Sequence, residues 1–332
     1  MDLSVNYLGL KIKTPIVAGS SSLTSSLANL KKLEENGAGA VVLKSIFEEE
    51  IYLEYQSILE KEKNFEHPDV RFLDYYDYKI KQDNIKKYLA LIKEAKSVLN
   101  IPVIASINCK SQWEWSFFAK KIEEAGADGI ELNMFILPSD FSLTCEKVEN
   151  TYLNIITSIK EAVNIPVAAK LSYYSSDLAA FVKRVSETGV DGVVLFNRFF
   201  HPDFDIDKFE VIPSNVLSRP SDIAISLRWM SILSGRIDCD LIASTGVHDG
   251  AGVVKELLAG ADAVQVVSAL YQHGIKYLGN MTRDLKDWMS KHGFEKIEDF
   301  RGKMSQINSP NPAEYERVQF MRYFEGKKYD LD

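Results

Sequence analysis

Apolar runs alternate along the chain with segments in which apolar residues recur every three or four positions. Four segments each combine a helix end, a glycine turn and an apolar run; they are 35–45, 124–133, 187–197 and 258–268. Four further apolar runs lie at 14–20, 100–108, 164–172 and 238–245. These runs are rich in Val, Ile and Leu without polar alternation, which is typical of parallel strands covered on both faces. The pattern therefore predicts eight buried parallel strands.

The segments between these strands have helical periodicity. Clear examples are 26–37, 87–99, 113–126 and 178–189. A strand–helix unit repeated eight times indicates the α/β class, and it favours a closed (β/α)8 TIM barrel over an open, doubly wound sheet.

Three segments depart from a bare barrel. Residues 3–13 predict an N-terminal hairpin that closes the barrel bottom, with Gly9 in its turn. Residues 46–83 form a long connection rich in Glu, Tyr and Lys, which favours a functional lid or a disordered insert. The sequence thus divides into a barrel, 1–304, and a C-terminal helical tail, 305–332, which we expect to pack on the barrel or on a partner subunit.

Composition narrows the functional class. A formal net charge of -8 argues against a nucleic-acid partner, because phosphate affinity comes mainly from clustered Lys and Arg. Cys109, Cys145 and Cys239 are far apart and form no CxxC pair, so we expect free thiols in a reducing compartment and no metal. No apolar run approaches the roughly 18 residues of a membrane span, and the N-terminus does not read as a secretion signal. We therefore expect a cytoplasmic protein with no membrane partner.

Polar residues stand at the C-terminal ends of the predicted strands, where the chemistry of this architecture lies. In chain order they are Gly19-Ser20, Lys44-Ser45, Ser106 and Asn108, Glu131 and Asn133, Lys170 and Ser172, Asn197, Ser244-Thr245-Gly246, and Gln265 and Ser268. Each Ser or Thr alone is explained by capping a loop or helix, but two lysines on one rim predict a functional site. The last two strand ends, with Thr245-Gly246 and Ser268, occupy the usual phosphate position of barrels.

Short motifs at these strand ends form an ordered set. They are K-S after the second strand, A-S-I-N after the third, E-L-N after the fourth, A-K-L after the fifth, T-G after the seventh and Q-V-x-S-A after the eighth. Over about residues 3–303 this set resembles the dihydroorotate dehydrogenase family, and it is similar to the FMN domain of dihydropyrimidine dehydrogenase. The resemblance implies that the 1–304 barrel binds FMN, acts on a small-molecule substrate and forms a homodimer.

The resemblance also implies roles for individual residues. Gly19 and Ser20 would lie against the flavin ring, and Lys44 and Ser45 would approach its N5 edge and the substrate. Asn108 and Asn133 would hydrogen-bond the ring system, and Asn197 matches an Asn of the family that touches the flavin and the substrate side of the site. Lys170 would lie by N1 and the C2 carbonyl, where a cation stabilises the reduced flavin. The phosphate would be held by Thr245, Gly246 and Ser268.

The resemblance breaks where the family carries its general base. There E-L-N is followed by x-S-C-P or a Ser variant, and direct alignment places Ile136, which accepts no proton, at the base position. An insertion in this loop would let Ser139 or Asp140 stand in, with Cys145 as a more distant candidate. The catalytic candidates are therefore Lys44 and Ser139, and oxidation of dihydroorotate itself is in question.

Two further breaks affect the substrate side. The 46–83 connection lacks the family's N-x-M-G-L-P-N motif, and Asn197 is followed by Arg198 rather than by Ser or Thr. Arg71, Arg198 and His201 are polar groups near the expected mouth that would suit an anionic substrate or simply face solvent.

Three functional hypotheses remain. The first is an FMN-dependent oxidoreductase that moves hydride from the CH–CH group of a small substrate, such as a dihydropyrimidine, to flavin N5. The second is an inactive FMN- or phosphate-binding barrel that serves as a partner protein, which the missing base motivates. The third is a lyase or isomerase with Lys170 as a Schiff-base lysine, which leaves the other rim residues unexplained. Because the chain has no NAD-binding Gly-rich loop, its electron acceptor would be a free small molecule or a partner protein.

Overall fold

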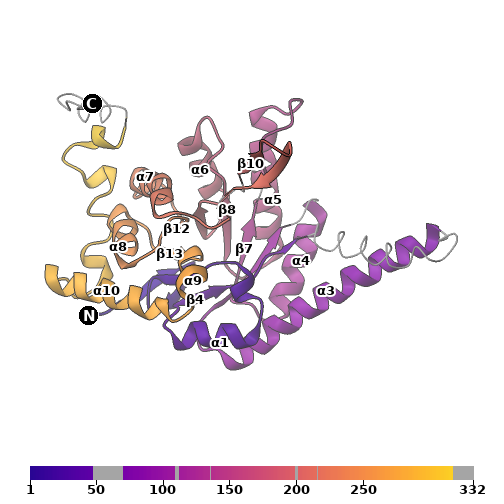
Figure 1. Cartoon of the computed structure of the whole chain (residues 1–332), viewed down its shortest axis with the longest axis horizontal. Helices are drawn as coiled ribbons and strands as arrows, with labels where there is room; N and C mark the ends of the chain where they lie inside the picture. Colours follow the sequence, from indigo (N-terminus) through magenta and orange to yellow (C-terminus); the bar gives the residue numbers. More distant parts are fainter. Residues whose placement is uncertain (48–69, 109–111, 135, 199–200, 215, 317–332) are drawn as a thin grey trace.

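The computed structural model describes the chain except residues 48–69, 109–111, 135, 199–200, 215 and 317–332, and it describes no side chains at 70–83 and 112–114. Its central feature is a closed barrel of parallel strands (Figure 1). In chain order they are β3 (Ile16–Ala18), β4 (Ala40–Val42), β6 (Val103–Asn108), β7 (Gly129–Asn133), β8 (Val167–Leu171), β9 (Gly192–Leu195), β12 (Asp240–Ser244) and β13 (Ala263–Val266). Pairing of β4 with β6, with Val41 opposite Val103, completes the ring. The predicted (β/α)8 barrel is confirmed.

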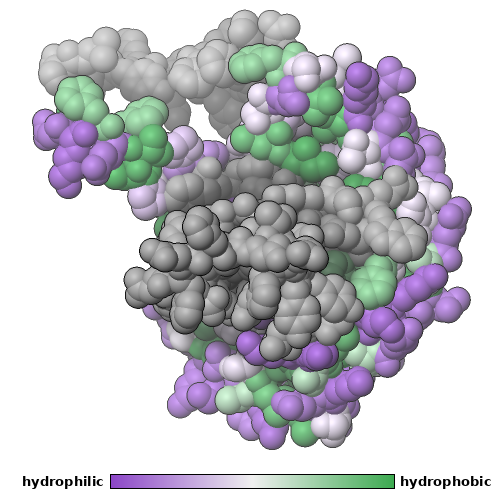
Figure 2. Space-filling view, turned by 90° about the vertical axis from the view of Figure 1, so that its right-hand side faces the viewer, coloured by the Kyte–Doolittle hydropathy of each residue, from purple (hydrophilic) through white to green (hydrophobic). Residues whose placement is uncertain are grey.

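Helices cover the outside of the barrel (Figure 1). They are α1 (Leu27–Glu35), α3 (Val70–Val98), α4 (Gln112–Glu124), α5 (Cys145–Ala162), α6 (Leu178–Ser186), α7 (Ile223–Leu233), α8 (Gly250–Ala259), α9 (Ser268–His273) and α10 (Tyr277–His292). Hydrophilic residues line the outer edge of the face in Figure 2, as expected for helices that bury one side only. Among the helices of the described residues, none is both long and apolar enough to cross a membrane.

Glycines end several of these helices. Gly260 follows α8 with φ +114°, and a Cβ there would lie 2.0 Å from Ser234 Oγ. Both facts require glycine, which reaches this conformation without a side-chain clash. The chain can therefore turn at once from α8 into β13, which is the strand entry that the sequence pattern predicted.

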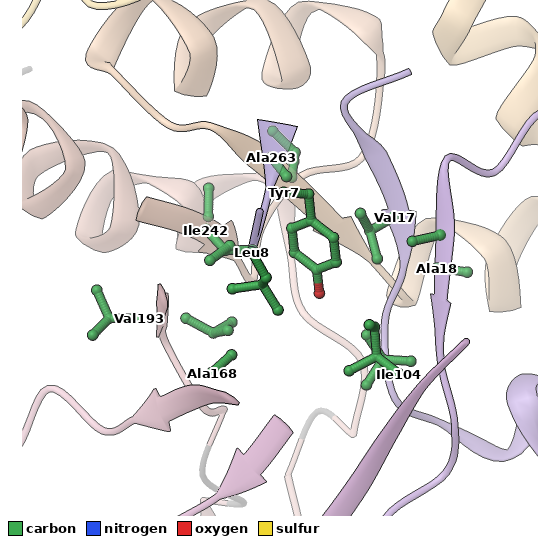
Figure 3. Close-up of a cluster of buried hydrophobic side chains, with 14 of the residues drawn as sticks. Tyr7, Leu8, Val17, Ala18, Ile104, Ala168, Val193, Ile242 and Ala263 are labelled. Carbon is green, nitrogen blue, oxygen red and sulfur yellow. The ribbon is translucent and has the colours of Figure 1, made fainter. Parts of the chain in front are cut away.

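The predicted N-terminal hairpin is present as β1 (Val5–Tyr7) and β2 (Leu10–Ile12). Leu8 in its turn donates its backbone N–H to Asp240 Oδ2 over 2.6 Å, at the first residue of β12. Tyr7 and Leu8 are buried, and Figure 3 shows their side chains among barrel residues such as Val17 and Ile104. The hairpin therefore closes the end of the barrel at which the strands begin.

The connection after β4 differs from the prediction. A short strand, β5 (Ile46–Phe47), pairs with the end of β6, and α3 already begins at Val70. The expectation of a connection up to residue 83 is therefore wrong for 70–83, which are helical. Residues 48–69 lie outside the described part of the chain.

A second hairpin was not predicted. It consists of β10 (Pro202–Asp205) and β11 (Glu210–Pro213), which pair antiparallel after β9. Most of its residues are exposed, and the sequence of this segment has no continuous apolar run of the kind by which the buried strands were predicted.

The tail beyond residue 304 begins with short 3₁₀ turns, η4 (Gln306–Asn308) and η5 (Pro312–Tyr315), rather than a longer helix. Tyr315 donates its hydroxyl to the Met304 carbonyl over 2.7 Å, and Arg228 of α7 donates to the Tyr315 carbonyl over 3.3 Å. The described part of the tail therefore packs on its own barrel. The aromatic cluster at Phe320, Tyr323 and Phe324 lies outside the described residues.

Candidate active site

A cavity of about 560 Å³ opens at the C-terminal ends of the barrel strands. Its volume is in the range of cofactor and ligand sites. The lining residues are Ser20, Ser21, Ser22, Lys44, Ser45, Phe47, Asn133, Lys170, Phe196, Asn197, Arg198, Val216, Leu217, Ser218, Ser244, Thr245, Gly246, Val247, Gln265, Val267, Ser268 and Tyr271. Apart from Gly19 and Asn108, every predicted cofactor-binding residue is among them.

Gly19 and Asn108 do not line this cavity, but each lies next to a residue that does. Gly19 donates its N–H to the Val266 carbonyl, and a Cβ at Gly19 would lie 2.8 Å from Val267 Cγ2. Asn108 Nδ2 donates to the Asn133 carbonyl over 2.7 Å. Asn108 therefore holds a cavity-lining residue in place, and the missing Cβ at Gly19 leaves room for the side chain of Val267, which lines the cavity.

Hydroxyl groups link the first three strand ends. Ser45 Oγ lies 3.1 Å from Ser20 Oγ and 2.7 Å from Ser106 Oγ, and it accepts a 3.1 Å hydrogen bond from Asn133 Nδ2. Asn133 Oδ1 is buried and has no hydrogen-bond partner among the described residues. Ser20, Ser45 and Asn133 all line the cavity, so this network forms one part of its wall.

A buried ion pair lies at the centre of the barrel below this group. Lys170 Nζ donates to Gln265 Oε1 over 2.9 Å and lies 3.5 Å from Glu131 Oε1. Gln265 Nε2 donates in turn to Glu131 Oε2, so its amide bridges both charges. The sequence placed all three residues on the rim, whereas Glu131 is in fact fully buried. Of the two charged residues, Lys170 lines the cavity and Glu131 does not.

The opposite end of the cavity has the backbone geometry of an anion site. Thr245 and Gly246 both have positive φ, +80° and +83°, and a Cβ at Gly246 would lie 2.0 Å from the Ile223 nitrogen. Consecutive residues in turns of this kind can direct N–H groups toward an anion. Ser268 Oγ accepts a 2.9 Å hydrogen bond from the Ser218 N–H, which draws the loop before α7 to this end.

The sequence interpretation missed several lining residues here. Ser218 lies 3.0 Å from His248 Nε2 and is buried with it, and Tyr271 bonds to Ser22. These contacts connect loops that are far apart in the chain. No periodicity or spacing in the sequence marks them, because each residue alone reads as an ordinary loop or helix position.

The loop after β7, which the sequence linked to the general base, lies apart from the main cavity. Ile136 is half-buried, and Ser139 and Asp140 are exposed. Hydrogen bonds from Ser142 hold the pKa of Asp140 below its usual range, which weakens this carboxylate as a base. Ile136 and Asp140 line a separate hollow of about 280 Å³. Ser139 is not among the described residues that line either space.

Cys145, the more distant base candidate, lies in that same hollow beside Glu149 and Asp177. A hydrogen bond to Glu149 raises the pKa of the Cys145 thiol, so this thiol stays protonated and is a poor base. Arg184 bonds to Glu149 and lies 3.7 Å from Asp177. The guanidinium therefore offsets part of the negative charge of this cluster.

A smaller cavity of about 200 Å³ adjoins the main one and shares Asn197, Arg198 and Thr245 with it. His201 lines this smaller cavity, so the structure brings together two of the polar groups predicted at the mouth. Arg198 donates to the Val216 carbonyl over 2.5 Å, and its Nε lies 3.7 Å from Asp222. The side chain of Arg71 lies outside the described part of the chain.

Comparison with known proteins agrees with this arrangement. The family model described as dihydroorotate dehydrogenase matches residues 73–289. The catalytic subunit of dihydroorotate dehydrogenase B (NAD(+)) from Thermoplasma volcanium is 28% identical over 312 residues, which covers 91% of this chain and 98% of the relative. The protein of the same name from Pyrococcus abyssi is 28% identical over 307 residues, 90% and 98% of the two chains. That from Methanocaldococcus jannaschii is 27% identical over 284 residues, 82% and 88% of the two chains. With a closed barrel, a cavity at its strand ends and this match over most of its length, the chain belongs to the dihydroorotate dehydrogenase family.

Proposed function

We propose that the protein is an FMN-dependent oxidoreductase that dehydrogenates the CH–CH group of a small substrate. Within the family, the cofactor assignment is supported by the cavity between Lys170 and the Thr245-Gly246 turn, whose volume and donor set suit a phosphorylated flavin. The single observation that carries it is that one cavity at the strand ends is lined both by Lys170 and by the Thr245-Gly246 turn, in which both residues have positive φ.

When bound, FMN supplies the acceptor for two electrons and a proton in the form of hydride. Lys170 would hold positive charge next to the ring, which favours the reduced form. Thr245, Gly246 and Ser268 would hold the phosphate through backbone N–H groups and hydroxyls. Lys44 and Ser45, which line the same cavity as Lys170, would orient the substrate, which loses hydride from one carbon and a proton from the next.

The proton requires a base, and we propose Ser139 for this role. It lies in the loop that carries the base in the family, three residues after Ile136. Among the other candidates, Asp140 and Cys145 are both held in their weakly basic forms. To act, Ser139 must come within about 3 Å of the substrate carbon's proton, which requires this exposed residue to move toward the main cavity.

The second candidate function is a flavin-binding partner protein without catalysis. Ile136 favours it, since this side chain occupies the aligned base position and offers no proton acceptor.

The curated relatives are named as catalytic subunits with NAD(+) as acceptor. We infer that electrons leave this protein through a separate subunit or a small molecule.

The test is an absorbance spectrum of the purified protein followed by anaerobic addition of dihydroorotate. Absorbance near 450 nm, present as purified or gained with added FMN, is expected. Bleaching by dihydroorotate would establish the family reaction, and bleaching only by another dihydropyrimidine would establish a changed substrate. A flavin that none of a panel of dihydropyrimidines reduces would favour the partner protein. Absence of flavin binding would contradict both proposals.

A further inference from the structure

Ser218, in the segment before α7, joins the two loops that carry the predicted phosphate-binding groups. Its backbone N–H donates to Ser268 Oγ over 2.9 Å, and its own hydroxyl oxygen lies 3.0 Å from His248 Nε2. Ser268 is the first residue of α9, after β13, whereas His248 follows the Thr245-Gly246 turn after β12. Because β12 and β13 are paired in the barrel, one serine bridges two neighbouring strand ends.

The hydrogen bond from the Ser218 N–H determines what the Ser268 hydroxyl can offer a ligand. A hydroxyl has one proton to donate, and its oxygen here already accepts the N–H. Within the described residues nothing accepts the Ser268 proton, and Ser268 lines the main cavity. The proton can therefore be donated to a group in the cavity, and the oxygens of a phosphate are strong acceptors for it.

The His248 side chain gives the Ser218 hydroxyl a fixed partner. Both residues are buried, and their mutual hydrogen bond is the only one that either side chain makes in the described part of the chain. A buried imidazole or hydroxyl without a partner is costly. Since a hydroxyl can both donate and accept, the pair is satisfied whichever ring nitrogen carries the proton. Each group therefore holds the other in place.

The segment that begins with Ser218 also contacts the other side of the phosphate end. A Cβ at Gly246 would lie 2.0 Å from the nitrogen of Ile223, the first residue of α7, so the two backbones are in direct contact there. Residues 218–223 thus contact the Thr245-Gly246 turn at one end and Ser268 at the other. The position of Ser218 therefore sets how Ser268 faces the turn.

We propose that His248 is a positioning residue for the phosphate end of the main cavity. Through the Ser218 hydroxyl it keeps the Ser218 N–H on Ser268 Oγ, which directs the Ser268 proton into the cavity. The ligand that this arrangement selects is a phosphorylated flavin over an unphosphorylated one. This inference rests on the proposed function, because that end of the cavity is where the phosphate of FMN would bind. His248 itself is not among the described residues that line the cavity.

The loss of this contact should affect the phosphate and not the ring. His248→Leu should weaken FMN binding by about tenfold, roughly the loss of one hydrogen bond to a charged group. Riboflavin, which has the same ring and no phosphate, should bind the variant and the wild type equally. His248→Gln should bind FMN nearly as tightly as the wild type, because its amide can still donate to or accept from the Ser218 hydroxyl.

The first experiment measures the dissociation constants of FMN and riboflavin by flavin fluorescence for the wild type, His248→Leu, His248→Gln and Ser218→Ala. Ser218→Ala should lose as much FMN affinity as His248→Leu. Ser231→Ala is the matched control, since Ser231 is also buried but its hydroxyl bonds to the Leu227 carbonyl within α7. Unchanged FMN affinity in His248→Leu, equal losses for both flavins, or a His248→Gln as weak as His248→Leu would overturn the proposal.

The second experiment needs no flavin and uses inorganic phosphate as the probe. A ligand that binds only the folded protein raises the free energy of unfolding. This rise is measured in urea, in phosphate against chloride of equal ionic strength, for the wild type and His248→Leu. The general effect of phosphate on folding is common to both proteins. A larger rise in the wild type is therefore expected, and equal rises would contradict the proposal. A protein that binds neither flavin would refute the proposed function, and the phosphate comparison would still decide the role of His248.

Discussion

Asn133 Nδ2 donates a 3.1 Å hydrogen bond to Ser45 Oγ, across 88 residues of sequence. The same oxygen lies within 3.1 Å of Ser20 Oγ and 2.7 Å of Ser106 Oγ. One hydroxyl therefore joins four strand ends, and the polar rim is a connected network rather than a row of separate side chains. Removing a shared partner from such a network leaves several groups unsatisfied.

Ser45→Ala should therefore destabilise the protein more than a typical serine deletion. We expect a loss of about 1–3 kcal/mol in the free energy of unfolding, measured in urea, because buried partners lose their hydrogen bonds. Ser25→Ala is the control, since Ser25 is exposed and bonds only within its own turn. Equal stabilities of the two variants would show that the network contributes little.

Lys170→Met should destabilise the protein strongly, because it leaves the carboxylate of Glu131 buried without its counter-ion. Breaking a buried ion pair from one side costs about 3–5 kcal/mol. The double variant Lys170→Met/Glu131→Gln should recover most of this loss in urea unfolding of the flavin-free protein. A double variant as unstable as Lys170→Met alone would mean that the loss comes from packing and not from charge.

Gly246→Ala should disrupt the proposed phosphate end of the cavity. The added Cβ would lie 2.0 Å from the Ile223 nitrogen, at a residue with φ +83°. We expect at least about 2 kcal/mol of destabilisation and weaker FMN binding, measured by urea unfolding and flavin fluorescence. Gly279→Ala is the opposite control, because no neighbour lies within 4 Å of a Cβ at this position in the first turn of α10. That variant should gain roughly 0.4–1 kcal/mol, because alanine lowers the conformational entropy of the unfolded chain.

The hydrophobic pattern predicted the barrel because strands covered on both faces and glycine-terminated helices are local features of the sequence. The rim residues followed from the barrel, since every strand end lies on the same face. The Glu131–Lys170–Gln265 contacts could not be predicted, because they depend on how far each strand extends into the ring. The Ser218–His248 pair could not be predicted either, because it joins two loops that are far apart in the chain. The β10–β11 hairpin was missed because most of its residues are exposed, and exposed strands do not require the continuous apolar runs by which the other strands were predicted.

Ser139→Ala tests the proposed base. The rate of flavin reduction by the substrate that reduces the wild type should fall by about 10²-fold, the smaller end of what a general base contributes. Flavin affinity should stay unchanged, because Ser139 does not line the main cavity among the described residues. Leu137→Ala, an exposed position of the same loop, is the control and should reduce at the wild-type rate. Unchanged kinetics in Ser139→Ala would remove Ser139 from the mechanism.

Glu256 of α8 gives the protein a predictable dependence of stability on pH. The side chain is fully buried, and burial raises the pKa of its carboxyl to about 8, although a 2.6 Å hydrogen bond from Ser226 opposes the shift. The folded state therefore keeps a proton that the unfolded state loses near its ordinary pKa of about 4.3. The contribution of this proton to the free energy of unfolding is complete below about pH 4.3. Above that pH it declines by up to about 1.4 kcal/mol per pH unit, and it is lost as the pH passes about 8. Glu256→Gln, which keeps an acceptor for Ser226, should flatten this decline and be the more stable protein at pH 8.5 in urea unfolding. The exposed Glu298→Gln should follow the wild type, and a Glu256→Gln profile parallel to the wild type would show that Glu256 is ionised in the folded protein.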